Sequence, residues 1–394
     1  MTTAREAPNR RRWSKATRAR PVESGPLRLL LVTPRYVPHV GGVEHHVHQV
    51  ARRLARAGVD VTVLTTDPAG QLPPDERSEG VRIIRVPAWP ARRDYYVAPG
   101  IYRTIVDGGW DLVHVQSYHT LVGPLAMLAA LRAKIPYVLT FHGGGSSSRL
   151  RNALRGAQLR LLRPLLARAE RLVAVARFEV ELYGRRLRLP RERFACIPNG
   201  SDMASAAQPG PAQDDGTLLA SVGRLERYKG HHRILAALPL ILAQRPDARL
   251  WIAGSGPYEQ PLRDLARRLG VEQRVEIRAV PAAERETMAR ELSRARLVVL
   301  LSEFETHPIA VMEALALGRP ALVADTSGLS ELAERGLARA IPLESTPAQV
   351  AAAALDQLRQ PLAPPSVELP TWDECAAGLL ELYATVMGRL QCAS

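Results

Sequence analysis

Short apolar runs alternate along the chain with stretches of helical periodicity, and this alternation restricts the fold more than any other feature. Several runs lack polar alternation, which is typical of strands buried on both faces of a sheet. Helical patterns separate many of them, such as the pattern over 42–58, which Gly58 ends as a C-cap. Strand, helix and strand in this order predict a parallel sheet wrapped by helices. The first series of predicted strands covers 27–34, 59–66, 81–87, 111–117, 136–142, 171–176 and 193–200.

The same alternation restarts after a small, polar, Pro- and Gly-rich stretch that predicts a linker. With 394 residues, the chain is long enough for two domains with separate cores. We therefore predict an α/β protein with two Rossmann-like, doubly wound domains. Open parallel sheets bind ligands at the carboxyl ends of their strands, so the active site is expected in the cleft between the domains. The second series of predicted strands covers 217–223, 248–254, 274–280, 296–302 and 320–326.

The pattern also predicts where each part of the chain begins and ends. Few apolar residues and no periodicity indicate a disordered basic arm at the N-terminus. A proline-rich passage precedes the last helical pattern, at about 373–390. The predicted parts are the arm over 1–26, an N-terminal domain over 27–200, the linker over 201–216, a C-terminal domain over 217–370 and a terminal segment over 371–394.

The net charge of +14 comes from two segments. Residues 1–26 hold seven cations and two acids, and residues 149–193 hold thirteen arginines and four glutamates. The remainder is neutral, so the charge gives little support to a nucleic-acid surface. The sequence also shows no zinc finger, helix-turn-helix or aromatic RNA-binding signature. We therefore expect no nucleic-acid partner.

The three cysteines, Cys196, Cys375 and Cys392, lie far apart and predict neither a disulfide framework nor a metal knuckle. No apolar stretch approaches the roughly 20 residues of a spanning helix. The first apolar run is too short for the core of a signal peptide. We expect a cytoplasmic protein, either soluble or peripheral at the inner face of the plasma membrane.

Two cations follow the predicted strand over 217–223, Arg224 and Lys229. Lys229 is one of only three lysines among 53 cations. Arginine offers a planar fork of donors and lysine a compact point charge, and the two together suit a diphosphate. A solvated loop with incidental charge would carry the same residues.

Glu305 and Glu313 follow the predicted strand over 296–302, where Thr306 is expected to cap a helix that has Pro308 in its first turn. Their spacing along a helix would be about 12 Å. Paired glycosidase carboxyls lie roughly 5–5.5 Å apart in retaining enzymes and roughly 6.5–9.5 Å apart in inverting ones. The spacing better fits two contacts on one elongated ligand, since a carboxylate can accept from both hydroxyls of a vicinal diol. Two surface glutamates on an amphipathic helix are the alternative.

His142 ends the predicted strand over 136–142 and precedes three glycines. The glycines leave the backbone free to approach a ligand. In this sheet His142 would point into the cleft, although a strand-end histidine alone is more often structural.

These motifs together resemble the retaining glycosyltransferases of family 4, over about residues 27–391. Single motifs are moderately specific, whereas their ordered set is strong. The resemblance implies the GT-B fold, with a nucleotide-diphosphate sugar donor held mainly by the C-terminal domain and the acceptor by the N-terminal domain. The motifs, in the family's order, are GGVE (41–44), CIPNGSD (196–202), VGRLERYKG (222–230), IAGSGP (252–257), the Glu-x7-Glu stretch (305–313) and ALGRPALVADTSGLSEL (316–332).

The resemblance also implies roles for individual residues. Glu305 and His142 are implied as catalytic residues beside the transferred sugar, and Glu313 as the ligand of the ribose hydroxyls. The terminal helix, introduced by Trp372, is implied to cross back onto the N-terminal domain, and the base to be held by backbone near Val280. The implied diphosphate contacts are Gly41, Gly42, Arg224 and Lys229, and the implied donor-sugar contacts are Thr306, His307, Pro308 and Ile309.

The implied reaction moves a hexose from a UDP- or GDP-linked sugar to a hydroxyl of a sugar, lipid or small molecule. Such reactions serve glycolipid, cell-envelope polysaccharide or small-molecule glycoside synthesis. The sequence contains no Asp-x-Asp motif, so we expect neither metal nor cofactor. Arg224, Lys229 and the helix N-terminus after Gly42 would stabilise the leaving diphosphate instead. No carboxylate is clearly placed as a covalent nucleophile, so the resemblance implies front-face attack with retention.

The chain departs from the family pattern at two places. Members commonly have Glu-Gly-Phe-Gly where this chain has Glu305 to Pro308, and Pro308 removes one backbone N–H that a sugar could use. Members commonly have Gly-Gly where this chain has Ser327 and Gly328. A non-catalytic nucleotide-sugar-binding protein, or an epimerase of the same fold, is the alternative function. A phosphorylase would need a pyridoxal-phosphate lysine, and few lysines are available.

The stretch over 39–50 holds four histidines and one glutamate, which suggests a metal site. On a helix His45 and His48 share a face, and Glu44 lies one turn from His48. No Asp or Cys lies nearby to complete a set of ligands. We expect the glycines of this stretch to be its functional part, with His45 or His46 near the acceptor.

Leucines and arginines alternate at roughly helical spacing over 149–172. Such a helix can lie on an anionic membrane, which would bring the site near a lipid-linked acceptor. An ordinary surface helix that packs its leucines into the N-terminal domain is the favoured alternative, partly because Pro164 breaks the pattern.

Overall fold

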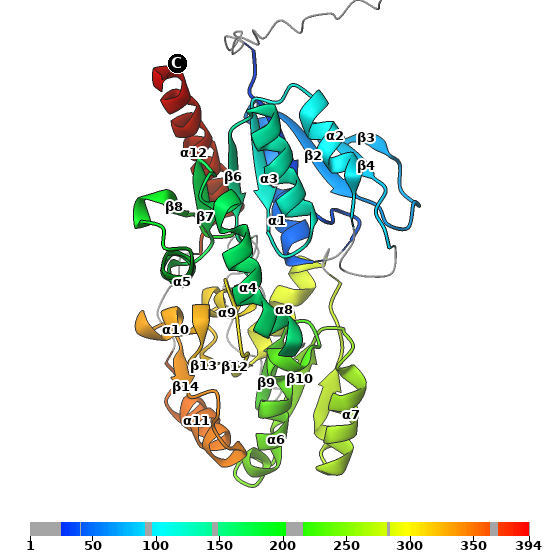
Figure 1. Ribbon diagram of the computed structural model, residues 1–394. Coiled ribbons are helices and arrows are strands. Elements are labelled where there is room, and N and C mark those ends of the chain that lie inside the picture. Colours follow the sequence, from blue (N-terminus) through cyan, green and yellow to red (C-terminus); the bar gives the residue numbers. More distant parts are fainter. Residues whose placement is uncertain are drawn as a thin grey trace, which may run out of the picture.

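The chain folds into two α/β domains, which form the upper and lower halves of Figure 1. Almost all of the predicted arm and linker lies outside the described residues. The computed structural model describes residues 25–39, 41–90, 97–143, 149–201, 216–281, 284–362 and 369–393.

An eight-stranded sheet forms the N-terminal domain, with strand order β3-β4-β2-β1-β5-β6-β7-β8. All pairings are parallel except that of β3 with β4. Its strands are β1 (Arg28–Val32), β2 (Asp60–Thr66), β3 (Asp75–Ser78), β4 (Val81–Val86), β5 (Leu112–Gln116), β6 (Tyr137–Thr140), β7 (Arg171–Ala174) and β8 (Phe194–Cys196). Its helices are α1 (Gly42–Arg56), α2 (Pro99–Asp107), α3 (Val122–Ala133), α4 (Arg149–Leu166) and α5 (Arg177–Leu187), with a 3-10 turn, η1 (Arg191–Arg193).

A six-stranded parallel sheet forms the C-terminal domain, with strand order β11-β10-β9-β12-β13-β14. From β9 the chain adds strands first on one side (β10, β11) and then on the other (β12, β13, β14). Doubly wound sheets bind ligands at this switch point between β9 and β12. Its strands are β9 (Leu218–Val222), β10 (Arg249–Ala253), β11 (Val275–Ile277), β12 (Leu297–Leu300), β13 (Ala321–Ala324) and β14 (Arg339–Ile341). Its helices are α6 (His231–Leu242), α7 (Glu259–Arg268), α8 (Arg285–Arg294), α9 (Ile309–Ala316), α10 (Ser327–Glu334) and α11 (Pro347–Arg359), with 3-10 turns η3 (Arg227–Lys229) and η4 (Glu272–Arg274).

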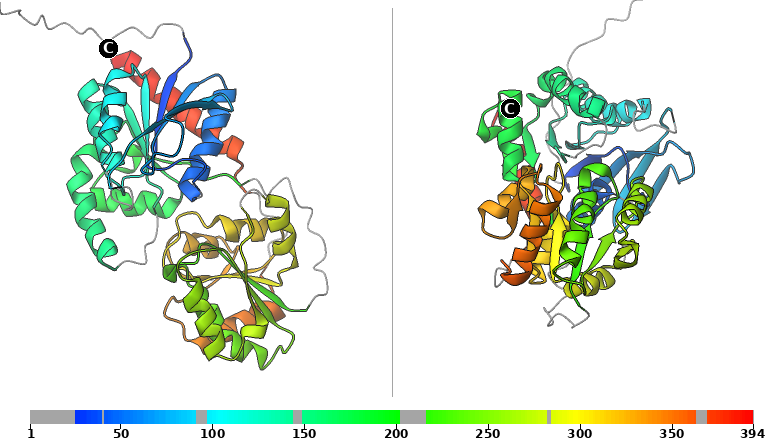
Figure 2. Two further views of the ribbon diagram at one scale, coloured as in Figure 1. Left: turned by 90° about the vertical axis from the view of Figure 1, so that its right-hand side faces the viewer. Right: turned by 90° about the horizontal axis from the view of Figure 1, so that it is seen from below.

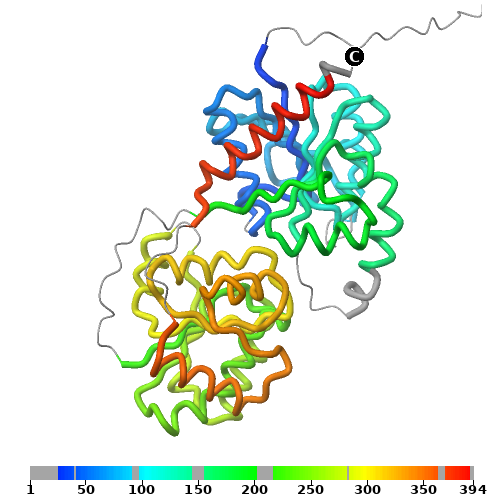
Figure 3. The backbone as a smooth tube through the Cα atoms, turned by 90° about the vertical axis from the view of Figure 1, so that its left-hand side faces the viewer, coloured from blue at the N-terminus to red at the C-terminus, as the bar shows by residue number. Residues whose placement is uncertain are grey.

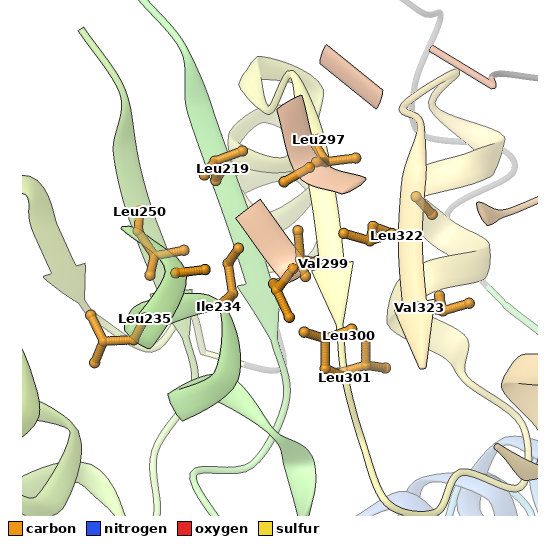
Figure 4. Packing of buried hydrophobic residues seen from close by; sticks show 14 of the residues in the cluster. Leu219, Ile234, Leu235, Leu250, Leu297, Val299, Leu300, Leu301, Leu322 and Val323 are labelled. Carbon is orange, nitrogen blue, oxygen red and sulfur yellow. The ribbon is translucent and has the colours of Figure 1, made fainter. Parts of the chain in front are cut away.

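Helices cover both faces of each sheet, which explains why the central strands are largely apolar. In β1, Leu30 packs toward α2 and α3, whereas Leu29 and Leu31 pack toward α1 and the terminal helix. In the C-terminal domain Leu219, Leu250, Leu297 and Leu322 line one face of the sheet, where Ile234 and Leu235 of α6 cover them (Figure 4). The prediction of two doubly wound domains is confirmed.

Every predicted strand corresponds to an observed one, but β3 and β14 were not predicted. The residues of β3, Asp-Glu-Arg-Ser, are polar and mostly exposed, because β3 is an antiparallel edge strand. β14 has only three half-buried residues at the opposite edge of the second sheet. Neither strand has the apolar run that marks a strand buried on both faces.

The terminal helix α12 (Trp372–Ala393) lies against the N-terminal domain, although it follows the C-terminal domain in sequence (Figures 2 and 3). Trp372 and Tyr383 are almost fully buried there beside residues of α1 and β1. Tyr383 Oη lies 2.6 Å from Nδ1 of His114 in β5. Near the start of α12, the Ser201 N–H donates to the Pro370 carbonyl over 2.8 Å. Residues that lie far apart in sequence therefore meet at Ser201 and Pro370.

Helix α4 packs most of its described leucines inward, as expected for a surface helix. Leu159, Leu162 and Leu166 belong to the core of the N-terminal domain. Leu161 is 79% exposed, between the exposed Arg160 and Arg163. Among the helices of the described residues, none is long and apolar enough to cross a membrane.

Buried histidines predict that the fold loses stability in acid. Burial lowers the pKa of His114 to about 3 and that of His231, in the other domain, to about 4. The unfolded chain takes up these protons near pH 6.5, so protonation favours unfolding. Their stabilising contribution should be complete above pH 6.5 and fall progressively toward pH 4.

Urea denaturation at pH 7, 6 and 5 measures this effect as a decreasing free energy of unfolding. Replacing both histidines by asparagine should flatten the dependence. A free energy of unfolding that stays constant between pH 7 and pH 5 would contradict the assignment of both rings as neutral.

Candidate active site

The residues predicted for the site follow the carboxyl ends of strands in both domains. His142 comes soon after β6 and Gly41 lies beyond β1 in the N-terminal domain, while Arg224 follows β9 and Glu305 follows β12 in the C-terminal domain. Contacts between the domains join these ends, since Thr306 Oγ1 donates to the Gly143 carbonyl. The two sheets thus direct their ligand-binding edges toward one another.

An ion pair between Lys229 and Glu305 spans the switch point of the C-terminal sheet. Lys229 Nζ lies 2.6 Å from Glu305 Oε1, and the Ser302 hydroxyl lies 2.8 Å from the same oxygen. The two charged side chains are only 16% and 10% exposed. Gly230 permits this approach, because a Cβ there would lie 1.9 Å from the Leu301 carbonyl oxygen. The pair therefore lies in a site that solvent reaches poorly.

Arg224 is the more accessible cation, with a side chain that is 65% exposed. Its guanidinium contacts Tyr228 Oη at 3.1 Å and Glu226 Oε1 at 3.2 Å. Burial lowers the pKa of Arg224, but Tyr228, Glu226 and, from α1, Glu44 raise it above its ordinary value. The start of α1 therefore faces the Arg224 loop from the opposite domain.

Gly41 and Gly42 form that start of α1. Gly41 is the N-cap and has no side chain to occupy the first N–H groups, which carry the positive end of the helix dipole. A Cβ on Gly42 would meet no atom of the described residues within 4 Å. At Gly41, by contrast, a Cβ would clash with the carboxylate of Glu44, so this acidic side chain lies beside the helix N-terminus and near Arg224.

Glu313 lies in α9 and is 5% exposed. Its Oε1 forms an ion pair with Arg285 Nη2 and accepts a hydrogen bond from the Ser201 hydroxyl at 3.3 Å. Glu313 and Glu305 therefore have different partners. The sequence did not predict that Arg285 and Ser201 contact this carboxylate.

The prediction that Thr306 caps a helix with Pro308 in its first turn is wrong. Helix α9 begins at Ile309 with Pro308 as its N-cap. A residue before proline is disfavoured in the helical conformation, so the helix cannot extend back through His307. Thr306 instead bonds Gly143 of the other domain. Burial lowers the pKa of His307 to about 4, although a hydrogen bond with the Val175 backbone acts in the opposite direction and raises it.

Ser327 takes the place of the first glycine of the family's Gly-Gly pattern. Its φ is +45°, in the left-handed region where glycine is usual. Its hydroxyl oxygen accepts the Glu305 N–H at 2.8 Å, and the Gly328 N–H donates to the Glu305 carbonyl at 2.9 Å. The serine side chain thus helps to hold the backbone of Glu305. At Gly328 a Cβ would lie 2.3 Å from the Thr306 carbonyl oxygen.

His142 lies at the end of β6 with its ring held on two sides. Its Nε2 lies 2.7 Å from the Gln116 amide oxygen, which can only accept, so Nε2 carries the proton. The His46 ring packs edge-on against it, with centroids 4.5 Å apart. Burial, with smaller effects from neighbouring histidines, lowers the pKa of His142 well below its usual value. The ring is therefore neutral at physiological pH.

The histidines of α1 point toward different neighbours. His45 packs against Trp372 with centroids 5.4 Å apart, while His48 Nδ1 lies 3.2 Å from Tyr36 Oη. Burial lowers the pKa of His46 to about 4. Within the part of the chain that the structure describes, no group of three His, Cys, Asp or Glu side chains is arranged to hold a metal ion.

Several residues of the site were missed at the sequence level. Gln116 and Ser302 are polar residues at the ends of apolar strands. A polar residue in this position was the reason for selecting His142, and the same pattern could have identified these two. Arg285 and Ser201 meet Glu313 only through the tertiary fold. No local pattern distinguishes them from other polar residues of loops and helix starts.

Comparisons with known proteins agree with this geometry. The model of "Glycosyltransferase Family 4" matches residues 40–205, and that of "Glycosyl transferases group 1" matches residues 203–361. A glycogen synthase of Mycobacterium tuberculosis is 32% identical, over 79% of this chain and 81% of the relative. A D-inositol 3-phosphate glycosyltransferase of Nocardiopsis dassonvillei is 29% identical, over 87% of this chain and 89% of the relative.

Solved structures share the fold over nearly the whole chain. Sucrose-phosphate synthase from Thermosynechococcus elongatus superposes with a TM-score of 0.71 at 22% identity, over 93% of this chain and 100% of that one. Anabaena Alr3699/HepE in complex with UDP-glucose superposes with a TM-score of 0.64 at 17% identity, over 93% of this chain and 98% of that one. The fold is GT-B, and the chain belongs to glycosyltransferase family 4.

Proposed function

We propose that this glycosyltransferase moves a hexose from a UDP- or GDP-linked sugar to a hydroxyl acceptor, with retention and without a metal ion. The observation that carries the proposal is the buried Lys229–Glu305 pair beside the accessible Arg224. Charges at this edge of the sheet suit a diphosphate next to a polar sugar. The acceptor class would be a glycolipid, a cell-envelope polysaccharide or a small-molecule glycoside.

The diphosphate would lie between Arg224, Lys229 and the N-terminus of α1. As the glycosidic bond breaks, negative charge develops on the leaving diphosphate. Cations and helix N–H groups that are already in position stabilise this charge without having to move. Both cations belong to the C-terminal domain, whereas Gly41 and Gly42 belong to the other domain. The proposal therefore requires both domains to contact the donor.

The ribose would bind at Glu313, whose carboxylate now contacts Arg285 and Ser201. Two vicinal hydroxyls can donate to one carboxylate, so they would take over or share these contacts. The base would lie near Val280 and be held by backbone groups. UDP-glucose in the complex of Alr3699/HepE supports a nucleotide sugar as donor.

The transferred sugar would lie between Glu305 and His142, with Thr306, His307, Pro308 and Ile309 around it. In the proposed reaction, the bond between the anomeric carbon and the diphosphate oxygen breaks, and that oxygen keeps the electron pair. The acceptor hydroxyl attacks the same face of the sugar, and its proton passes to the leaving phosphate oxygen. Neutral His142 would orient the sugar and the acceptor.

A panel of UDP-, GDP- and ADP-sugars tests the donor. We expect one donor to raise the melting temperature, because a ligand that binds only the folded state stabilises it by mass action. The same donor should be hydrolysed slowly without acceptor, and Lys229→Gln should remove both effects. Binding without turnover would favour a non-catalytic binding protein, and conversion of the sugar within the donor would favour an epimerase.

Gly42→Val should abolish transfer, because branched carbons would occupy the space in which α1 approaches the diphosphate. The fold should tolerate the change, since that space is empty of protein. His48→Ala is the matched control on the same helix and should leave transfer unchanged. The measurement is product formation with the identified donor, alongside the melting temperature of each variant. The reverse pattern would point back to a metal on α1.

Peripheral contact with an anionic membrane is the remaining part of the proposal. Exposed Arg160 and Arg163 beside Leu161 favour attraction to anionic headgroups. The inward packing of Leu159, Leu162 and Leu166 leaves little apolar surface for insertion on this part of α4. Sedimentation should therefore be greater with anionic than with neutral vesicles, and should fall with added salt. Equal sedimentation with both would exclude this contact.

A further inference from the structure

Gly143, the residue after His142, is held from both domains. Its N–H donates to Glu179 Oε1 of α5 over 3.0 Å. Its carbonyl oxygen accepts the Thr306 hydroxyl, which belongs to the C-terminal domain next to Glu305. Backbone groups of one glycine therefore connect the two halves of the site.

The backbone of His142 requires such support. Its φ is +43°, a left-handed conformation that residues other than glycine rarely adopt. Residues in this region persist only where the surroundings hold them, and they concentrate at functional sites. The bond from Gly143 to Glu179 fixes the peptide directly after His142.

Glu179 does more than cap its own helix. Its Oε2 accepts the N–H of Val175, the residue before the N-cap Ala176, over 3.0 Å. Its Oε1 leaves the helix and reaches the loop after β6. The side chain is fully buried, and burial raises the pKa of its carboxyl to about 7, although the two N–H donors oppose this shift. Holding two N–H groups with one carboxylate thus costs desolvation that a solvent-exposed cap would avoid.

The space around Gly143 is closed. A Cβ there would lie 2.5 Å from Glu179 Oε1, and 3.2 Å from both Thr306 Oγ1 and Tyr183 Oη. The backbone of Gly143 therefore has little room to shift while these partners remain in place.

We propose that Glu179 is a positioning residue for glycosyl transfer, which fixes the Gly143 backbone and so aims the His142 ring at the donor sugar. This inference rests on the proposed function, because it takes His142 to contact that sugar. Thr306 completes the arrangement from the other domain, so His142 is fully positioned only when the two domains meet.

Glu179→Gln tests the proposal. The amide keeps one oxygen but presents its NH₂ to the other N–H, so Gly143 or Val175 loses its acceptor. We expect kcat to fall by about 100-fold, the effect typical of a misplaced catalytic group. The donor KM should stay close to that of the unaltered protein, because the diphosphate contacts remain, whereas the melting temperature should fall by a few degrees because a buried N–H loses its acceptor. Glu181→Gln, the same change at an exposed position of α5, should alter none of these values.

Two results would overturn the proposal. One is an unchanged kcat in Glu179→Gln. The other is a rise in the donor KM together with the falls in kcat and melting temperature, which would reduce Glu179 to a helix cap. His142→Ala adds a further check: if it keeps full kcat while Glu179→Gln does not, Glu179 does not act through His142.

Hydrogen exchange of the Gly143 amide measures the contact without turnover. Exchange should be slow in the unaltered protein and faster in Glu179→Gln. Should that variant fail to fold, Thr306→Val removes the opposite contact and should also speed this exchange and lower kcat. Exchange that is equally fast with and without these contacts would refute the positioning role. Failure of the unaltered protein to turn over any nucleotide sugar would instead refute the proposed function.

Discussion

The ion pair between Lys229 and Glu305 joins the loops that follow β9 and β12, the two strands between which the C-terminal sheet reverses its order. A parallel sheet leaves its ligand edge open at this place, because the connections from the two strands turn to opposite faces. Charge at this edge is needed for ligands but costs desolvation when it is buried. Pairing, with Ser302 as a third partner, keeps both charges in a poorly hydrated site. Gly230, Ser327 and Gly328 then serve one purpose, which is to bring the backbone close around this pair.

Contacts between the domains involve residues next to the predicted site residues. Thr306 follows Glu305 directly and reaches Gly143, which follows His142 directly. Glu305 and His142 are thus each adjacent in sequence to a residue that joins the domains. Glu313 has its own distant partner, since the Ser201 hydroxyl donates to it. Contacts between distant parts of the chain therefore lie among the residues with proposed roles.

Much of the fold was predictable because burial on both faces makes a parallel strand apolar throughout, and several of the twelve predicted strands have this property. The edge strands β3 and β14 were missed because burial does not shape their sequences. In the site, Arg224, Lys229 and the two glutamates were found by motif, and their roles remain predictions. Arg285, Ser201 and Glu179 act through partners far away in sequence, and only the tertiary fold brings them together. The cap assigned to Thr306 failed because Pro308 sets the helix start.

The hydrogen bond between Ser201 and Pro370 joins two parts of the chain that lie far apart in sequence. Beside it, Gly200 lies so close to Trp372 that a Cβ on Gly200 would clash with the Trp372 backbone. Trp372 begins α12, which packs into the core of the N-terminal domain. The 22-residue helix therefore belongs to the first domain by packing and follows the second in sequence, so no single cut in the chain separates the two domains without dividing a hydrophobic core.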